Sequence, residues 1–156
     1  MQSRRTIAAK NISGDPLDKS EVEKEDIDFL QHIGGELINL SDGYAEVAFE
    51  IQPYHKQHHG TVHGGAIATL ADHTGWYAVI SEIPSGFSSV TIELKVNYLK
   101  PAAGEVLSAQ AKVINRTKRT AFATIEIFAK DTLIAYATGT YAVFQERENA
   151  HTQRDK

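Results

Sequence analysis

The residues with the clearest potential for chemistry lie in one stretch, HGGAIATLADHTGWYAVI (63–80). Asp72 stands in the middle of a segment that is otherwise apolar or small on nearly every side, so a helix here should be buried almost all round. No cation lies three or four residues away, where a helical ion pair would need it. A buried carboxylate without a counter-ion is costly and commonly has a function. Asp72 is therefore a candidate catalytic residue, unless it only fixes the helix through a solvent channel or a distant partner.

Gly64 and Gly65 come immediately before the expected start of this helix, at residue 66. The first backbone N–H groups of a helix have no intrahelical acceptor, and glycine lets a ligand approach the backbone closely. The positive end of the helix dipole favours an oxyanion at the same place. By itself a Gly-Gly pair could be no more than an entry turn. Together with a carboxylate two turns later, it indicates an oxyanion site and a base or nucleophile, the two groups that acyl transfer requires.

The bulk composition excludes several classes of protein. The chain has 156 residues, 42% hydrophobic and 23% charged, with a net charge of −4, which suits one compact globular domain and favours neither nucleic acid nor an anionic membrane as partner. It has no cysteine, which excludes disulfides, thiolate metal sites and a cysteine nucleophile, and which fits a cytoplasmic location. The N-terminal segment has only the short apolar run 7–9, too brief for a signal peptide. No apolar run is long enough for a transmembrane helix.

A metal site is the main chemical alternative, because five of the seven histidines fall between positions 55 and 73. His59 and His63 are four apart and would share one helix face, but the glycines around them argue against a helix there. No glutamate follows His59, as it does in zinc proteases. The sequence also lacks a G-x-S-x-G elbow, which disfavours a serine hydrolase. We therefore expect neither a metal nor a cofactor, and expect His73 to be a core or interface histidine.

The remaining pattern predicts an α+β fold. A short helix is expected from a cap at Ser20, with Glu23 as capping-box partner, to Gly34–Gly35. Period-two alternation predicts five strands, and the long apolar helix falls between the first and second of them. Short turns favour antiparallel neighbours, and one long antiparallel sheet must cover its apolar face with this helix. The predicted strands are 44–51, 87–99, 105–115, 121–130 and 133–144, and the helix is 66–80.

The stretch HGGAIATLAD (63–72) resembles the signature of hotdog-fold acyl-CoA thioesterases, most closely the PaaI-like subgroup of the phenylacetate pathway. TIELKVNYLKPA (91–102) and ATGTYAVF (137–144) are similar to the same family. The resemblance covers roughly residues 35–144. It implies a sheet wrapped around the central helix. Outside it, the polar composition predicts an N-terminal lead and short helix over 1–34 and a polar tail over 145–156. It also implies a homodimer, or a homotetramer built as a dimer of dimers, with chains paired edge to edge and active sites at the dimer interface.

The resemblance also implies roles for individual residues. Asp72 would be general base or nucleophile, facing the loop of the other chain that carries His63 and Gly64. The Gly64 amide would polarise the thioester carbonyl, and His63 would orient the loop. Thr91 matches a strand position where a hydroxyl helps to position the attacking water. Gln57 is a departure, since relatives often have Asn six residues before the signature histidine, so the role of this side chain in contacting water or the leaving group is open.

The implied substrate is an acyl-CoA, hydrolysed to the free acid and coenzyme A; the alternative is a non-catalytic acyl-CoA binding or sensing module on the same scaffold. Gly65 and four basic residues are the expected coenzyme A contacts, although basic turns are most often solvated surface. The acyl preference is open; three aromatics could line an acyl cavity or belong to the core. The basic residues are Lys100, Arg116, Lys118 and Arg119, and the aromatics are Trp76, Tyr77 and Phe87.

Overall fold

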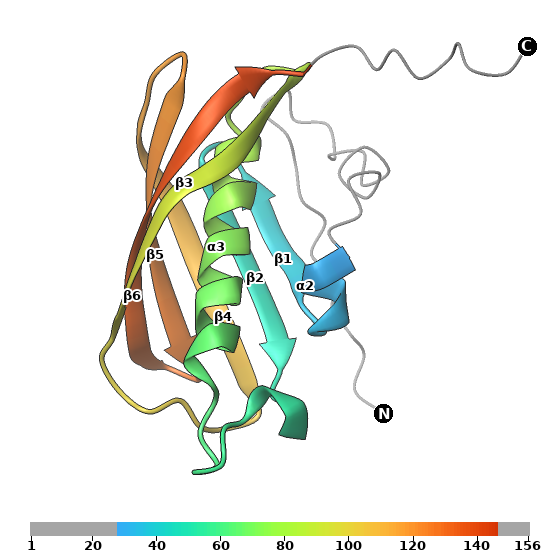
Figure 1. Cartoon of the computed structure of the whole chain (residues 1–156), viewed down its shortest axis with the longest axis vertical. Coiled ribbons are helices and arrows are strands. Elements are labelled where there is room, and N and C mark those ends of the chain that lie inside the picture. Colours follow the sequence, from blue (N-terminus) through green and yellow to red (C-terminus); the bar gives the residue numbers. More distant parts are fainter. Residues whose placement is uncertain (1–27, 147–156) are drawn as a thin grey trace, which may run out of the picture.

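The computed structural model describes residues 28–146. In this part of the chain an antiparallel sheet of six strands, in the order β1-β2-β4-β5-β6-β3, curves around the helix α3. Figure 1 shows α3 lying on the concave face of the sheet, with β3 and β6 curving past it on one side and β1 and β2 on the other. The elements are α2 (Asp28–His32), β1 (Glu36–Ser41), β2 (Tyr44–Glu50), the 3-10 turn η1 (Pro53–His55), α3 (Gly64–Ile80), β3 (Phe87–Tyr98), β4 (Val106–Arg116), β5 (Thr120–Ala129) and β6 (Thr132–Gln145).

The predicted α+β fold, a sheet wrapped around one central helix, is confirmed. The five predicted strands are present with ends that differ by a residue or so, and the helix ends at Ile80 as expected. Its start was predicted too late, because Gly64 and Gly65 already belong to its first turn. No helix in residues 28–146 is long and apolar enough to cross a membrane.

The sixth strand, β1, was not predicted. Its sequence ELINLS does not alternate cleanly, because the register with β2 shifts at a bulge between Leu37 and Asn39. The neighbouring turn did carry a signal, since Asp42-Gly43 is a typical two-residue hairpin connection and Gly43 has φ +67°.

The neighbours of β3 also differ from the expectation. β3 pairs with β6 and forms one edge of the sheet, whereas β4 pairs with β2 and β5. The connection over 99–105 therefore links an edge strand to a central one. Short turns do join the antiparallel neighbours β4, β5 and β6, as expected.

The short helix α2 ends where predicted. The N–H groups of Gly34 and Gly35 donate to Gln31 O and Leu30 O, a Schellman arrangement in which Gly34 takes φ +73°. A Cβ at position 35 would overlap the buried Leu30 side chain, so a glycine is needed there for packing as well. The predicted cap at Ser20 and its partner Glu23 lie outside the described residues.

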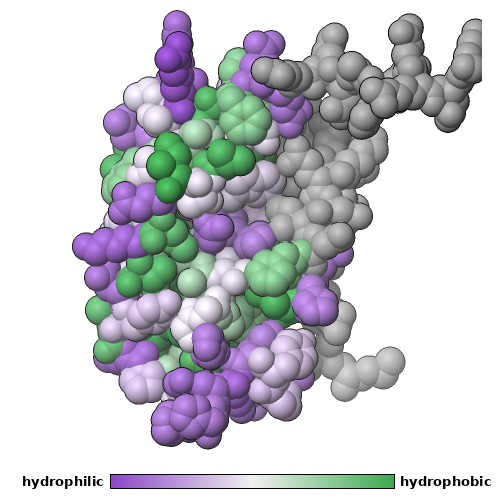
Figure 2. All heavy atoms as spheres, viewed as in Figure 1, coloured by the Kyte–Doolittle hydropathy of each residue, from purple (hydrophilic) through white to green (hydrophobic). Residues whose placement is uncertain are grey.

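Two groups of hydrophobic side chains remain on the face where α3 is open to view, one over β3 and one over α2 (Figure 2). In β3, Val90 is 54% and Ile92 60% exposed. In α2, Phe29 is 57% exposed. Large apolar side chains gathered at the surface commonly mark a binding surface.

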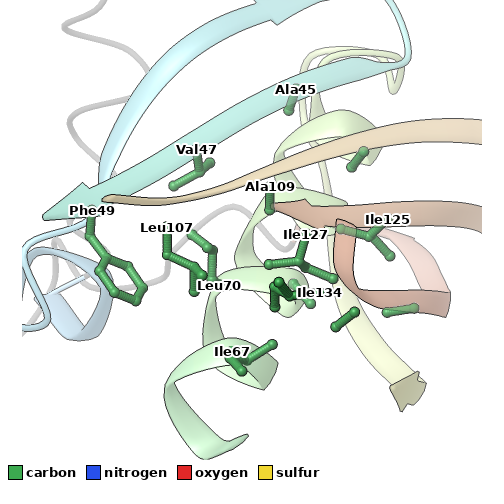
Figure 3. Close-up of a cluster of buried hydrophobic side chains, with 14 of the residues drawn as sticks. Ala45, Val47, Phe49, Ile67, Leu70, Leu107, Ala109, Ile125, Ile127 and Ile134 are labelled. Atoms are coloured by element: carbon green, nitrogen blue, oxygen red, sulfur yellow. The ribbon is translucent and has the colours of Figure 1, made fainter. Parts of the chain in front are cut away.

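The core lies between α3 and the concave face of the sheet. Ile67 and Leu70 point from α3 into side chains of β2, β4, β5 and β6 (Figure 3). The opposite side of α3 is only half-buried, so the prediction of a helix buried nearly all round was wrong for the single chain. This half-exposed side carries Ala68, Thr69, Asp72, His73 and Trp76.

One close approach holds α3 against β6. The Tyr141 ring fits between Gly75 of α3 and Gly139 of β6, and a Cβ at either glycine would collide with the Tyr141 ring or hydroxyl. Tyr141 is fully buried. The two glycines therefore set how closely the middle of α3 can approach the sheet.

We expect Gly75→Ala to lower the free energy of unfolding by about 1–3 kcal/mol, because the added methyl group overpacks a filled site. Combining it with Tyr141→Leu should cost less than the sum of the two single changes, since the smaller side chain removes the collision. Urea denaturation of the four proteins in this cycle measures the coupling. Additive effects would show that the collision does not limit the approach of α3.

Candidate active site

The first turn of α3 leaves one backbone amide open. His63 is the N-cap residue, and its Nδ1 accepts a hydrogen bond from Gly65 N–H at 2.9 Å. Because Nδ1 accepts, the proton of the neutral ring lies on Nε2. Within residues 28–146, Gly64 N–H has no acceptor. Of the two glycine amides expected to bind an anion, the Gly65 amide is thus occupied by the cap and the Gly64 amide is available.

Tyr98 fixes Gly64 from the end of β3. Its hydroxyl donates to Gly64 O at 3.0 Å, and a Cβ at position 64 would lie 3.3 Å from the Tyr98 ring. Sequence reasoning missed this residue, because Tyr98 reads only as one more position of an alternating strand. The hydrogen bond to the backbone could not be inferred from spacing.

Asp72 lies on the half-exposed side of α3, not in a closed interior. Its Oδ1 accepts a hydrogen bond from Thr91 Oγ1 of β3 at 2.8 Å, so the structure brings these two predicted site residues together. Among the described residues the only ion pair is Arg116–Glu82 at 4.0 Å, and Asp72 has no cationic partner. The carboxylate is therefore held by one neutral donor and remains reachable from outside the chain.

Tyr141 supports the helix directly beneath Asp72. Its hydroxyl makes a long hydrogen bond of 3.5 Å to the Asp72 backbone oxygen. Burial raises the pKa of the Tyr141 phenol well above its ordinary range, and the negative charge of Asp72 raises it further. The phenol is therefore a protonated donor at neutral pH, which suits a structural anchor for α3.

Gln57 lies in a tight loop that leads to α3. Its backbone N–H donates to Thr61 O at 2.9 Å, and its side-chain Nε2 donates to Thr61 Oγ1 at 2.7 Å. The amide nitrogen is thus engaged within its own loop, and the amide oxygen is left to accept a further hydrogen bond.

The histidines of this region have identifiable structural roles. In the buried His55, Nδ1 accepts from Gln52 N–H and Nε2 donates to Ile33 O, which ties η1 to the end of α2. His73 is half-buried on the open side of α3, so it is not a core residue of the described chain, and it donates from Nδ1 to Thr69 O. In the part of the chain that the structure describes, no three His, Asp or Glu side chains are grouped as metal ligands.

The candidate coenzyme A contacts fall into two groups. Lys100 follows the end of β3, whose Tyr98 contacts the start of α3. Arg116 pairs with Glu82, which follows the other end of α3, and Lys118 and Arg119 lie in the adjacent turn between β4 and β5. One chain therefore does not bring all four basic residues to one place.

The separation of the two reactive groups limits what one chain can do. Gly64 and Asp72 lie on the same helix, and eight residues at 1.5 Å each put them about 12 Å apart along its axis. A reacting carbonyl must lie about 3 Å from both its oxyanion donor and its nucleophile, which is either the carboxylate itself or a water held by it. Within one chain, the Gly64 amide and the Asp72 carboxylate therefore do not lie close together.

Comparison with known proteins identifies the family. The model of the thioesterase superfamily matches residues 59–136, which include the start of α3, Asp72 and Thr91. The chain belongs to this superfamily. The predicted resemblance to hotdog-fold thioesterases is confirmed, and with it the prediction that the protein is an enzyme of the thioester hydrolase class.

Individual relatives agree with this placement in the thioesterase superfamily. A protein of Saccharolobus solfataricus is 32% identical over 81% of this chain and 83% of its own length. PaaI of Escherichia coli, named an acyl-coenzyme A thioesterase, is 31% identical over 61% of this chain and 66% of its own length. The structure of PA5202 from Pseudomonas aeruginosa has a TM-score of 0.75 and 30% identity, covering 78% of this chain and 98% of that one.

The role of His63 as a helix cap can be tested by stability. We expect His63→Ala to lower the free energy of unfolding by about 1 kcal/mol, because Gly65 N–H loses its acceptor. His63→Asn should restore most of this loss, since Asn is among the best N-cap residues. Urea denaturation measures both, and His59→Ala, at an exposed histidine of the preceding loop, is the control. An Asn variant as unstable as the Ala variant would contradict the capping role.

Proposed function

We propose that this thioesterase hydrolyses acyl-CoA to a free acid and coenzyme A, at a site formed by Asp72 and Thr91 of one chain and Gly64 of another. The observation that carries the proposal is that α3 has an unengaged amide at its start and a carboxylate without a counter-ion eight residues later. Both lie on the open side of a helix whose other side is packed on the sheet.

The chemistry follows from these groups. The thioester oxygen accepts from Gly64 N–H, and the positive end of α3 stabilises the charge that develops on it. Asp72 takes a proton from water as the water oxygen attacks the carbonyl carbon, or attacks the carbon itself to form an anhydride that water then opens. The carbon–sulfur bond breaks, and the sulfur leaves as the coenzyme A thiol after it gains a proton. The Thr91 hydroxyl orients the Asp72 carboxylate.

Two features support a site shared between chains. The 12-residue strand β3 ends the sheet, so the outer row of its backbone N–H and C=O groups is unpaired in one chain. Exposed edges of this length invite pairing with another strand, and the exposed Val90 and Ile92 add apolar area to bury. Pairing two β3 strands would cover the half-exposed side of α3 and place a second chain beside Asp72.

The basic residues fit the same arrangement. With two chains in the site, Lys100 of the chain that supplies Gly64 and the turn residues of the chain that supplies Asp72 can lie near one substrate. We infer that these side chains contact the phosphates of coenzyme A, with Arg116 partly engaged by Glu82. The oxygen of Gln57 accepts from water or from the leaving group.

Removing the carboxylate tests the chemistry. Asp72→Asn should keep the fold and the Thr91 contact but lower kcat by about 10²–10⁴-fold, because the base or nucleophile is lost. Asp131→Asn, at an exposed turn between β5 and β6, is the matched control and should leave kcat unchanged. Steady-state release of the coenzyme A thiol measures both. Wild-type turnover in Asp72→Asn would refute the mechanism, and binding of acyl-CoA with no turnover by the natural protein would favour the sensing module instead.

Mixing two inactive variants tests the shared site. Gly64→Pro removes the N–H at a position where proline suits the helix, and His63 already has the extended backbone (φ −66°, ψ 138°) that precedes proline. Gly64→Ala, which retains the N–H, is its control. With random pairing, half of the dimers formed on co-expression are hybrids of a Gly64→Pro chain and an Asp72→Asn chain. In each hybrid, one of the two sites carries both changes and the other carries neither, so about a quarter of wild-type activity should be recovered. No recovery would mean that both groups act within one chain.

A further inference from the structure

A cavity of about 280 Å³ lies where α2, η1 and the first turns of α3 meet. It is open to solvent on one side and lies outside the Asp72–Thr91 contact. Its walls come from segments far apart in the sequence, which the His55 hydrogen bonds hold together. The lining residues are Phe29, His32, Ile33, Tyr54, His55, His63, Gly65, Ala66 and Thr69.

The lining is unsuited to a charged ligand. None of its residues is Asp, Glu, Lys or Arg. Both ring nitrogens of His55 are engaged, and so are Nδ1 of His63 and the hydroxyl of Thr69, which donates to Gly65 O. What faces the cavity is mainly aromatic and aliphatic carbon, so a neutral apolar group is the favoured occupant.

The cavity lies beside the first turn of α3. His63 and Gly65, which flank Gly64 in the chain, both line it. A thioester whose oxygen accepts from Gly64 N–H would therefore have the cavity within reach of its acyl group or of its coenzyme A. The phosphates and the adenosine of coenzyme A find no Lys or Arg in this lining, so the acyl group is the part of the substrate that suits the cavity best.

We propose that this cavity receives the acyl chain and sets the chain-length preference of the enzyme. The inference rests on the proposed thioesterase activity. A cavity of about 150 Å³ holds one benzene molecule, so this one accommodates about six to ten carbons, as a straight chain or with a single ring. Phe29 and Tyr54, which line the cavity and are 57% and 67% exposed, would then contact the acyl chain.

The cavity differs from the aromatic lining expected from sequence. Trp76 donates from Nε1 to Ser89 O at 3.0 Å, and its ring packs against Tyr77, which is buried in the core. Phe87 packs against a second buried cluster around Tyr141. None of the three lines the cavity at α2.

The test is a chain-length series from acetyl-CoA to dodecanoyl-CoA. In the natural protein, kcat/KM should rise about fourfold for each added methylene until the cavity is full, and then level off. Ala66→Leu places three more carbons in the cavity, so the levelling should come about two or three methylenes earlier. Ala48→Leu, the same change at another half-buried alanine on β2, should leave the profile unchanged.

A second variant covers the case in which Ala66→Leu does not fold. Phe29→Ala removes an exposed wall of the cavity without disturbing the core, and should reduce the gain per methylene at every length. Variants that lower kcat/KM equally for all chain lengths, or that keep the wild-type profile, would overturn the assignment of the cavity.

A protein that hydrolyses none of these substrates would refute the proposed function, and the cavity could still be tested by binding alone. S-alkyl-CoA thioethers from ethyl to decyl would then be titrated by calorimetry into the natural protein and the Ala66→Leu variant. Affinity that rises with chain length, and levels earlier in the variant, supports the cavity as the acyl site. Affinity independent of chain length refutes it.

Discussion

The spacing of residues along one α-helix constrains the whole functional arrangement. α3 carries both the open amide of Gly64 and the carboxylate of Asp72, and its rise holds them about 12 Å apart. The exposed edge of β3 and the half-buried side of α3 are, in our proposal, the surfaces on which a second chain completes the site.

Three side chains of the sheet hold α3, at its start and in its middle. At the start, Tyr98 binds Gly64 O while His63 caps the first turn. In the middle, Thr91 donates to Asp72, and Tyr141 packs under the same residue in the space left by Gly75. The strands that bury the helix therefore also orient its polar groups, so the packing of α3 on the sheet determines the geometry of the candidate site.

The order of the helices and strands that have a clear periodic pattern could be predicted from the sequence. The strand and the strand pairing that were missed have physical causes. Strands that alternate cleanly and the long apolar helix were predicted nearly to the residue. β1 was missed because a bulge at Leu37–Asn39 breaks its alternation, although Asp42-Gly43 marked the turn beside it. The pairing of β3 with β6 was also missed, since a chain connection does not reveal which strand lies at an edge. The site roles taken from the family resemblance remain proposals.

By itself, the sequence determined which local elements form, and the motif around Gly64 and Asp72 indicated the class of chemistry. These depend on residues close together in the chain, where periodicity and end signals act directly. Only the tertiary structure decided which glycine amide stays open, that Thr91 reaches Asp72, that the basic residues divide between the two ends of α3, and that α2 and η1 enclose a cavity beside Gly64. Each of these depends on contacts between distant segments, whose positions follow from the packing of the whole sheet around α3.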